Sequence, residues 1–477
     1  MTKEEKVKYL VSPEILFPTD LQRGNLLGNK MFIEAMEQYL NILTESQYWP
    51  LEQLEEIQNM RLRKLVSNIS NYSVFWKNYF DKHKFLPNTA NITDLSRLPI
   101  LRRTDLLAFG NKIYIKPRYA NEHSFIRYSS GTTGVPIKIS FSEQEMLIEI
   151  ACLFRHPVFE KVSLKQILSR KPFVVLGLPG FSYICRRDFF SSVFPSITTY
   201  DLDDIKIRKE IYNSIIAASP AILVGFGSLV AKLAYWVAED KVSLPLLAIR
   251  ISSESISVIE RNLIEKNFNA PVINILSGNG HITIGFECPI NSGRFHVNSE
   301  SVILEIVNDG NTENDEGELV ATALTYMLTP RIRWAHNDNG RILPETCPCD
   351  RTLPLFEFHG RRGYEIALPS GRRLRWILLH TSLMRAGLGR LSKQIQIIQD
   401  RTDNLRILIV PRLPFSDSDE LNIRLACTTL FNNEKINIEI KYVNEIIQNG
   451  RKPKFFIPLS ESNAKDSQED NYGRLKQ

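Results

Sequence analysis

Long hydrophobic runs are missing from this sequence, and cysteines are few. No apolar run approaches the roughly 20 residues that span a bilayer, and the chain has six cysteines among 477 residues. Cysteines this sparse do not form a disulfide framework, which fits a reducing compartment. The N-terminal residues include acidic side chains and no long apolar stretch, unlike a secretory signal peptide. These absences predict a cytoplasmic protein that does not cross a membrane.

A strong excess of one charge is also absent. The chain has 59 basic and 53 acidic residues, and the two signs are interspersed along it. This balance predicts no nucleic-acid partner. Hydrophobic residues at 43% and charged residues at 23% are typical of folded globular proteins. At roughly 150 residues per domain, the length predicts two to four structural units.

The order of apolar patterns predicts how these units follow one another. Residues 1–100 are expected to form a helical segment, because residues 51–80 carry an apolar stripe at helical spacing. In residues 101–360, short β-branched runs alternate with helical stretches, which predicts an α/β core with a largely parallel sheet that becomes antiparallel after residue 301. Residues 361–460 read as a small α+β domain, and the polar residues 461–477 as a disordered tail.

A loop rich in glycine and hydroxyl side chains follows Tyr128. Two glycines let backbone amides converge, and the neighbouring hydroxyls add donors, which suits a polyphosphate. An ordinary Ser/Thr/Gly turn explains the composition equally well, and the spacing is not that of a Walker loop. The candidate phosphate-binding residues are Ser129, Ser130, Gly131, Thr132, Thr133 and Gly134.

The loop sequence Ser-Ser-Gly-Thr-Thr-Gly-x-Pro resembles the phosphate loop of the adenylate-forming superfamily of acyl-CoA ligases. The segments 54–58, 72–76, 98–106, 286–289, 324–334, 347–352 and 360–362 also resemble, in order, its phenylacetate-CoA ligase and CapK-like branch. The resemblance runs from about residue 45 to 460. It implies the adenylate-forming enzyme fold: a large N-terminal α/β domain with a helical N-terminal segment, and a small α+β C-terminal domain.

The resemblance implies an AMP-forming acid–thiol ligase. Such an enzyme uses ATP and Mg²⁺ to convert a small carboxylic acid into an acyl-adenylate, then transfers the acyl group to CoA or to a carrier protein. Two alternatives stay open, namely transfer to an amine and a degenerate member that binds a nucleotide without catalysis. Relatives in this branch often form homodimers, and the sequence leaves the oligomeric state open.

The resemblance also assigns residues to the nucleotide. Asp338 stands where the family has the aspartate that binds the ribose hydroxyls, and Arg361 where an arginine faces the ribose or phosphate. Ser253 and Glu254 match the stretch beside adenine, and Lys138 is the lysine that follows the phosphate loop, displaced by one residue. Near the C-terminus, the catalytic lysine that neutralises the α-phosphate corresponds to Lys452, with Lys454 as the alternative.

Two departures from the family pattern concern acidic residues. The glutamate that binds Mg²⁺ in the family is replaced by Gly280-His281, and the hinge acids are replaced by Gly363-Tyr364. These losses are the reason for keeping the non-catalytic alternative.

Three cysteines and one histidine predict a structural zinc site. Cys288 and His296 flank a turn, and Cys347 and Cys349 supply two more thiolates. Such a set closes a tetrahedral shell around Zn²⁺. The alternative is that these thiols are only buried, since Cys-x-Cys is a shorter spacing than usual. Relatives in the phenylacetate-ligase branch resemble this chain in having similar cysteine and histidine positions.

Overall fold

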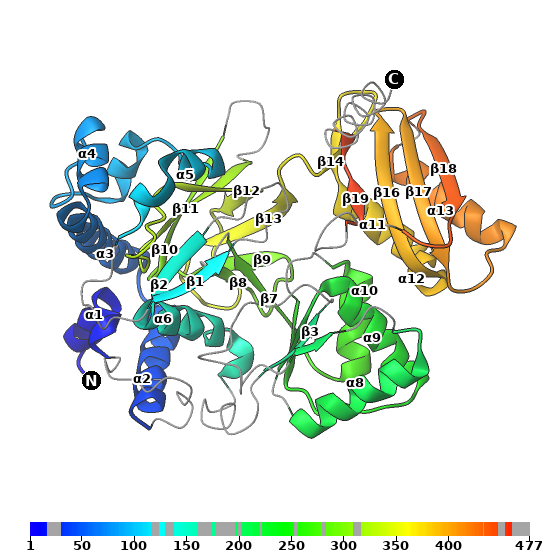
Figure 1. Cartoon of the computed structure of the whole chain (residues 1–477), viewed down its shortest axis with the longest axis horizontal. Coiled ribbons are helices and arrows are strands. Elements are labelled where there is room, and N and C mark those ends of the chain that lie inside the picture. Colours follow the sequence, from blue (N-terminus) through cyan, green and yellow to red (C-terminus); the bar gives the residue numbers. More distant parts are fainter. Residues whose placement is uncertain are drawn as a thin grey trace, which may run out of the picture.

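The structure is a computed structural model of the chain (Figure 1). It describes residues 1–16, 30–115, 124–128, 138–160, 173–177, 196–198, 202–219, 222–251, 256–278, 283–308, 316–432, 434–446 and 454–459. None of the helices in these ranges combines the length and the apolarity that crossing a bilayer requires.

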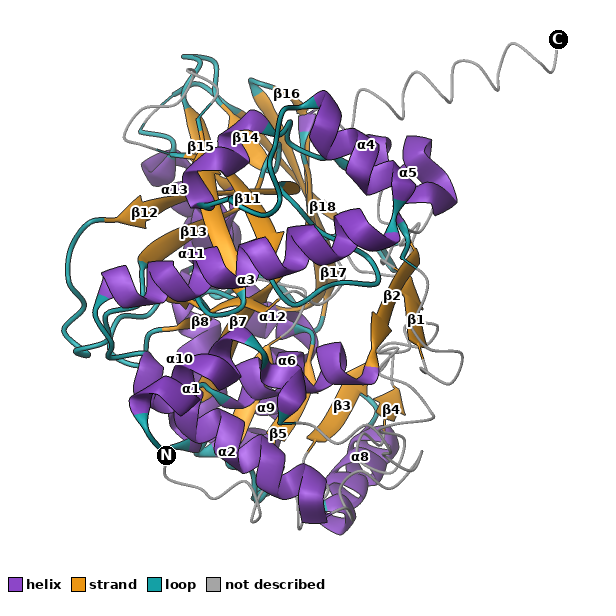
Figure 2. Cartoon of the chain, turned by 90° about the vertical axis from the view of Figure 1, so that its left-hand side faces the viewer, coloured by secondary structure: helices purple, strands orange, loops and turns teal. Residues whose placement is uncertain are grey.

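The described chain before residue 124 forms helices joined by loops. The α-helices are α1 (Lys3–Val11), α2 (Lys30–Ser46), α3 (Leu51–Tyr72), α4 (Val74–Lys82) and α5 (Arg103–Phe109). The apolar stripe predicted for residues 51–80 forms both α3 and α4, which are divided at Ser73, whose hydroxyl accepts a hydrogen bond from the Trp76 amide. Figure 2 shows α2 and α3 in front of the strands on this side of the molecule.

The centre of the molecule is an eleven-stranded sheet with the order β10-β11-β12-β13-β9-β8-β7-β6-β5-β3-β4. Its parallel part contains β3 (Phe173–Gly177), β4 (Ser196–Thr198), β5 (Ile222–Gly225), β6 (Ala248–Ile251) and β7 (Val272–Ser277). The helices α8 (Ile205–Ala218), α9 (Gly227–Glu239) and α10 (Val258–Phe268) alternate with these strands. This alternation confirms the predicted α/β class.

From β8 onward the sheet is antiparallel. These strands are β8 (Thr283–Glu287), β9 (Arg294–Val297), β10 (Val302–Val307), β11 (Gly317–Ala323), β12 (Trp334–Leu343) and β13 (Leu355–Arg361). A separate hairpin of β1 (Ser124–Tyr128) and β2 (Lys138–Ser142) leads into α6 (Glu143–Phe154). Ser142 and Glu145 form a capping box at the start of α6, so the hairpin passes directly into a stable helix.

The residues after 364 form a smaller unit with its own hydrophobic core. Its elements are β14 (Glu365–Ala367), β15 (Arg373–Arg375), α11 (Trp376–Arg385), α12 (Leu388–Leu391), β16 (Ser392–Arg401), β17 (Asn404–Pro411), α13 (Asp417–Leu430), β18 (Asn437–Tyr442) and β19 (Phe456–Ile457). The sheet order is β18-β17-β16-β19. A small α+β unit at this place is part of the predicted fold, while the exact domain boundaries stay predictions.

The small unit lies beside α10, which α11 contacts (Figure 1). Arg412, which follows β17, forms an ion pair with Asp203 at 3.3 Å, and its guanidinium lies 5.1 Å from the centre of the Tyr235 ring. On α11, the Nδ1 atom of His380 is 3.6 Å from a carboxylate oxygen of Glu260 on α10. These contacts hold the two parts together in this arrangement.

Candidate functional site

The predicted phosphate loop lies in the segment that connects β1 to β2. Residues 129–137 are outside the described residues, so Ser129, Ser130, Gly131, Thr132, Thr133 and Gly134 stay predictions. The register of the hairpin pairs Tyr128 with Lys138, which means that the loop connects two directly paired strand ends. The Lys138 ammonium lies 5.4 Å from the centre of the Tyr114 ring, and the Lys138 carbonyl accepts a hydrogen bond from the Tyr114 hydroxyl at 2.7 Å.

Two of the residues assigned to the nucleotide, Asp338 and Arg361, face each other across β12 and β13. They are paired in the strand register, and Nε of Arg361 is 3.5 Å from Oδ1 of Asp338. Asp338 is only 9% exposed, whereas nearly half of the Arg361 side chain is exposed. Burial raises the pKa of Asp338 to about 6, although the Arg361 charge acts in the opposite direction. The site therefore has a sheltered carboxyl group beside an accessible guanidinium.

The strand ends near this pair are held by a buried glutamate, Glu318 on β11. Arg102 donates to both of its carboxylate oxygens, at 3.0 and 2.7 Å, and Arg362 approaches one of them at 3.3 Å. The backbone amide of Arg362 also donates to the Asn337 carbonyl at 3.0 Å. These contacts fasten the chain to the large sheet just before it enters the small unit.

His336 lies two residues before Asp338 and packs against Gly278 at the end of β7. A β-carbon at position 278 would lie 1.8 Å from Cε1 of the His336 ring, so only glycine fits there. His336 is 1% exposed. Sequence reasoning assigned no role to His336, although the side chain stands inside the segment 333–338 that supplied Asp338.

Three of the remaining candidate residues lie outside the described residues and stay predictions: Ser253, Glu254 and Lys452. Of the two candidate lysines near the C-terminus, only Lys454 is described. Lys454 lies in the small unit just before β19, where its carbonyl accepts a hydrogen bond from Nε2 of Gln396 at 2.9 Å. This bond ties the segment after Lys452 to β16.

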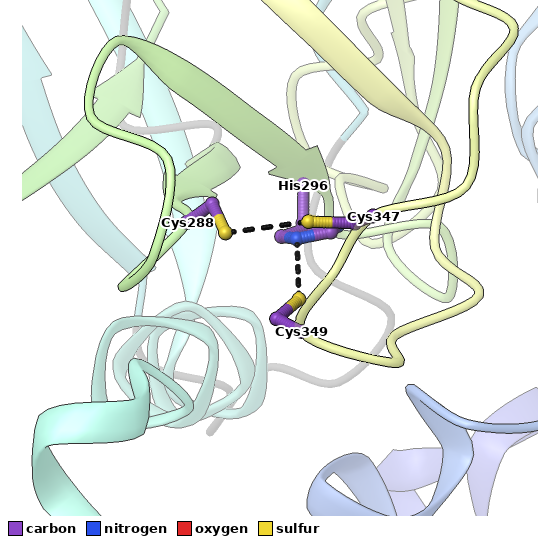
Figure 3. A group of neighbouring side chains, drawn as sticks. All are labelled: Cys288, His296, Cys347 and Cys349. Atoms are coloured by element: carbon purple, nitrogen blue, oxygen red, sulfur yellow. Dashed lines mark hydrogen bonds between the residues drawn. The ribbon is translucent and has the colours of Figure 1, made fainter.

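The four residues predicted to bind zinc come together in one cluster (Figure 3). Their ligand atoms all lie within 4.8 Å of one another. The sulfur atoms of Cys288 and Cys347 are 3.4 Å apart, and Sγ of Cys349 is 3.2 Å from Nε2 of His296. With Zn–S bonds of about 2.3 Å, tetrahedral ligands are separated by about 3.8 Å. The cluster therefore needs only small adjustments to hold a zinc ion.

The protonation chemistry of the cluster also suits a metal ion. Nδ1 of His296 is 3.3 Å from the Leu353 carbonyl, a contact that favours the proton on Nδ1 and leaves Nε2 as the ligand atom. Burial lowers the pKa of His296 to about 4, so its imidazole is neutral at physiological pH. Burial raises the pKa of Cys288 to about 12, so a metal ion would be needed to ionise this thiol.

Two tight turns present the thiols. In the β8–β9 turn, the Cys288 amide donates to the Arg294 carbonyl at 2.7 Å, and Gly293 has a φ of +86°. In the β12–β13 loop, the Asp350 amide donates to the Cys347 carbonyl at 3.1 Å. A polar turn in each loop therefore brings the cysteines to one point.

The β12–β13 loop also contacts the N-terminal helices. Nε of Arg351 donates to the side chain of Gln47 at 2.9 Å, and the Thr352 amide donates to the Gln47 carbonyl at the same distance. The Thr352 hydroxyl donates to the Trp49 carbonyl at 2.5 Å. The cysteine loop thus joins the α2–α3 connection to the large sheet.

No family model matches the sequence. Among curated proteins, the phenylacetate-coenzyme A ligase of Thermus thermophilus is 22% identical over 320 residues, which cover 64% of this chain and 69% of that protein. Protein CapK of Staphylococcus aureus is 22% identical over 297 residues, which cover 60% of this chain and 62% of CapK. The match thus spans less than two thirds of CapK.

Solved structures of CoA ligases share the fold. A 2-hydroxyisobutyryl-CoA ligase in its postadenylation state has a TM-score of 0.67 at 15% identity, over 90% of this chain and 94% of that chain. An anthranilate CoA ligase has a TM-score of 0.50 at 14% identity, over 73% of this chain and 67% of that chain. The chain therefore has the fold of these CoA ligases and is similar in sequence to the phenylacetate-coenzyme A ligase and to CapK.

The same neighbour has also been solved in a second state. The 2-hydroxyisobutyryl-CoA ligase in its thioesterification state has a TM-score of only 0.53 over the same share of each chain.

Proposed function

We propose that this chain uses ATP to convert a carboxylic acid into an acyl-adenylate and passes the acyl group to a thiol, that of CoA or of a carrier protein. The observation that carries the proposal is the pair of Asp338 and Arg361, a sheltered carboxyl group beside an accessible guanidinium. The pair lies where the large sheet of a superfamily fold leads into the small domain. The neighbour with this fold has been solved in complex with 2-HIB-AMP and CoA.

In the proposed reaction, a carboxylate oxygen of the acid bonds to the α-phosphorus of ATP, and pyrophosphate leaves. Asp338 would accept hydrogen bonds from the ribose hydroxyls, and Arg361 would donate to the ribose or phosphate. Lys452, with Lys454 as the alternative, would stabilise the charge that develops on the α-phosphate. The thiolate then attacks the acyl carbon, and AMP leaves with the bonding electrons.

The two metals implied by the sequence differ in their fit. Positions 280–281, where the family has its magnesium-binding glutamate, are glycine and histidine, so no carboxylate is available there. These residues do not fit Mg²⁺, and no step is assigned to it. The cluster of three cysteines and His296 does fit Zn²⁺. Four protein ligands leave no open position, so the proposed zinc would be structural.

The missing acidic residues favour one competing function, a nucleotide-binding member without catalysis. Exchange of labelled pyrophosphate into ATP, measured with a panel of apolar carboxylic acids, distinguishes the proposed ligase from a protein that binds a nucleotide without catalysis. We expect exchange that depends on one class of acid and that is lost in Asp338→Ala. Tight ATP binding with no exchange for any acid would support the non-catalytic function. Where exchange occurs, competition between CoA and amines identifies the acceptor.

Replacing Asp338 should weaken nucleotide binding. Asp338→Ala removes a carboxylate proposed to accept both ribose hydroxyls, and hydrogen bonds to charged groups contribute about 1.5–3 kcal/mol each. We expect ATP to bind on the order of 10- to 100-fold more weakly in isothermal titration calorimetry. Asp403→Ala, which changes an exposed acid of the small domain, is the matched control.

The raised pKa of Asp338 adds a pH dependence. As pH falls through about 6, the carboxyl group takes up a proton and becomes a weaker acceptor, so ATP affinity should decrease. Asp338→Asn should bind ATP weakly, and its ATP affinity should not change as pH passes through about 6. Unchanged affinity in both variants would remove Asp338 from the site.

A further inference from the structure

Two buried polar side chains near Asp338 have unpaired atoms. Arg331 is 2% exposed and His336 is 1% exposed. Nη1 of Arg331 and both ring nitrogens of His336 have no hydrogen-bond partner among the described residues. In the described part of the chain no carboxylate pairs with Arg331, whose guanidinium instead lies 4.9 Å from the centre of the Trp334 ring. Within the described ranges, a positive charge is therefore buried without a paired carboxylate.

Such an arrangement is costly in a protein without a ligand. A buried charge without a partner loses its hydration with nothing to replace it, and each buried polar group without a hydrogen bond lowers the stability of the fold further. Burial lowers the pKa of Arg331 only to about 10, so the guanidinium stays charged at neutral pH. Burial, together with the charges of Arg331 and Arg361, lowers the pKa of His336 to about 3, so its ring is neutral and can donate one hydrogen bond.

The two side chains lie between the elements already assigned to the nucleotide. Thr329, two residues before Arg331, is bonded to β2, because its hydroxyl accepts from the Ser140 amide and donates to the Ser140 carbonyl, both at 2.8 Å. Tyr114, which contacts Lys138 after the phosphate loop, lies near enough to Arg331 for its phenolate form to raise the pKa of Arg331. His336 leads on β12 to Asp338. The unpaired groups are thus placed between the phosphate-loop hairpin and the pair of Asp338 and Arg361.

We propose that Arg331 and His336 form an oxyanion subsite, which binds a phosphate or carboxylate group of the ligand held by Asp338 and Arg361. The guanidinium supplies the charge and the imidazole supplies one directed donor. A bound oxyanion would satisfy the groups that the protein leaves unpaired. This subsite adds a binding group to the proposed site. The choice of phosphate and carboxylate ligands rests on the proposed function.

The test compares stability with binding in Arg331→Met, which removes the charge and keeps similar volume. Without ligand, the melting temperature should stay the same or rise, because an unpaired buried charge has been replaced by an apolar group. Calorimetry should show at least a tenfold loss of affinity for inorganic pyrophosphate or for phenylacetate. Lost affinity for pyrophosphate identifies a phosphate subsite. Lost affinity for phenylacetate identifies a carboxylate subsite. Arg331→Lys should recover part of the lost affinity because it keeps the charge.

Arg341→Met is the matched control, since Arg341 is also on β12 but is partly exposed and paired with Glu357. It should leave affinity for both probes unchanged. His336→Leu should weaken binding of the same probe as Arg331→Met. A lower melting temperature in Arg331→Met with unchanged affinity for both probes would mean a structural role and overturn the subsite, as would wild-type protein that binds neither probe. Pyrophosphate binding that depends on Arg331, but with no pyrophosphate exchange for any acid, would support the subsite and contradict the proposed function.

Discussion

Cys347→Ser should release the proposed zinc ion and destabilise the large domain by about 4 kcal/mol or more, because losing a metal ligand also leaves the other thiols unpaired. The effect should be large because the cysteine loop also carries Arg351 and Thr352, which join the α2–α3 connection to the sheet. Elemental analysis of protein purified without chelator should show one zinc ion per wild-type chain and much less in the variant. Calorimetry should show the melting temperature of the large domain reduced by on the order of 10 °C.

Cys427→Ser provides the control for this experiment. Cys427 is a buried thiol in the core of the small domain, far in sequence from the cluster, so its replacement tests loss of a thiol without loss of a ligand. Its zinc content should stay at one ion per chain even if the small domain becomes less stable. Wild-type protein without zinc, whose melting temperature does not respond to added zinc or chelator, would show that these thiols are only buried.

Lys452→Ala should slow acyl-adenylate formation by on the order of 100- to 1000-fold. One preorganised donor to the developing charge contributes about 3–4 kcal/mol to transition-state stabilisation. ATP affinity should change far less, because the lysine is proposed to act on charge that grows during the reaction. Single-turnover release of pyrophosphate measures the step directly.

Lys454→Ala is the parallel variant, two residues further along the chain. Lys454 precedes β19, and its carbonyl is held by Gln396, so the substitution keeps the backbone contact and removes only the ammonium. If pyrophosphate release is slow in Lys454→Ala and normal in Lys452→Ala, Lys454 is the catalytic lysine. Normal rates in both variants would mean that the basic residues near 451–454 are a solvated surface.

Strongly periodic segments were predictable from the sequence, and polar strands were not. The helices α8, α9 and α10 and the parallel strands between them were predicted because apolar residues recur at helical or strand spacing. The strand β12 was missed because its sequence, Trp-Ala-His-Asn-Asp-Asn-Gly-Arg-Ile-Leu, contains a polar run without alternation. It forms because β11 and β13 supply hydrogen bonds on both sides.

The zinc cluster was predictable only in part. The ligand types were readable from the sequence, since three cysteines and one histidine are a recognised set. That Cys288 and Cys347, 59 residues apart, meet at 3.4 Å depends on the two turns and on the pairing of β13 with β9.

By itself, the sequence determined the α/β class, the superfamily resemblance and the residue types at the candidate sites, because periodicity and short motifs are local properties of a chain. The tertiary structure alone decided that Asp338 faces Arg361, that His336 lies against Gly278, and that no carboxylate in the described part of the chain pairs with the buried Arg331. Strand register and burial depend on contacts between residues far apart in the sequence, and a shift of one residue would turn Asp338 to the other face of the sheet. Whether a charge is paired or unpaired is settled only when those distant segments pack together.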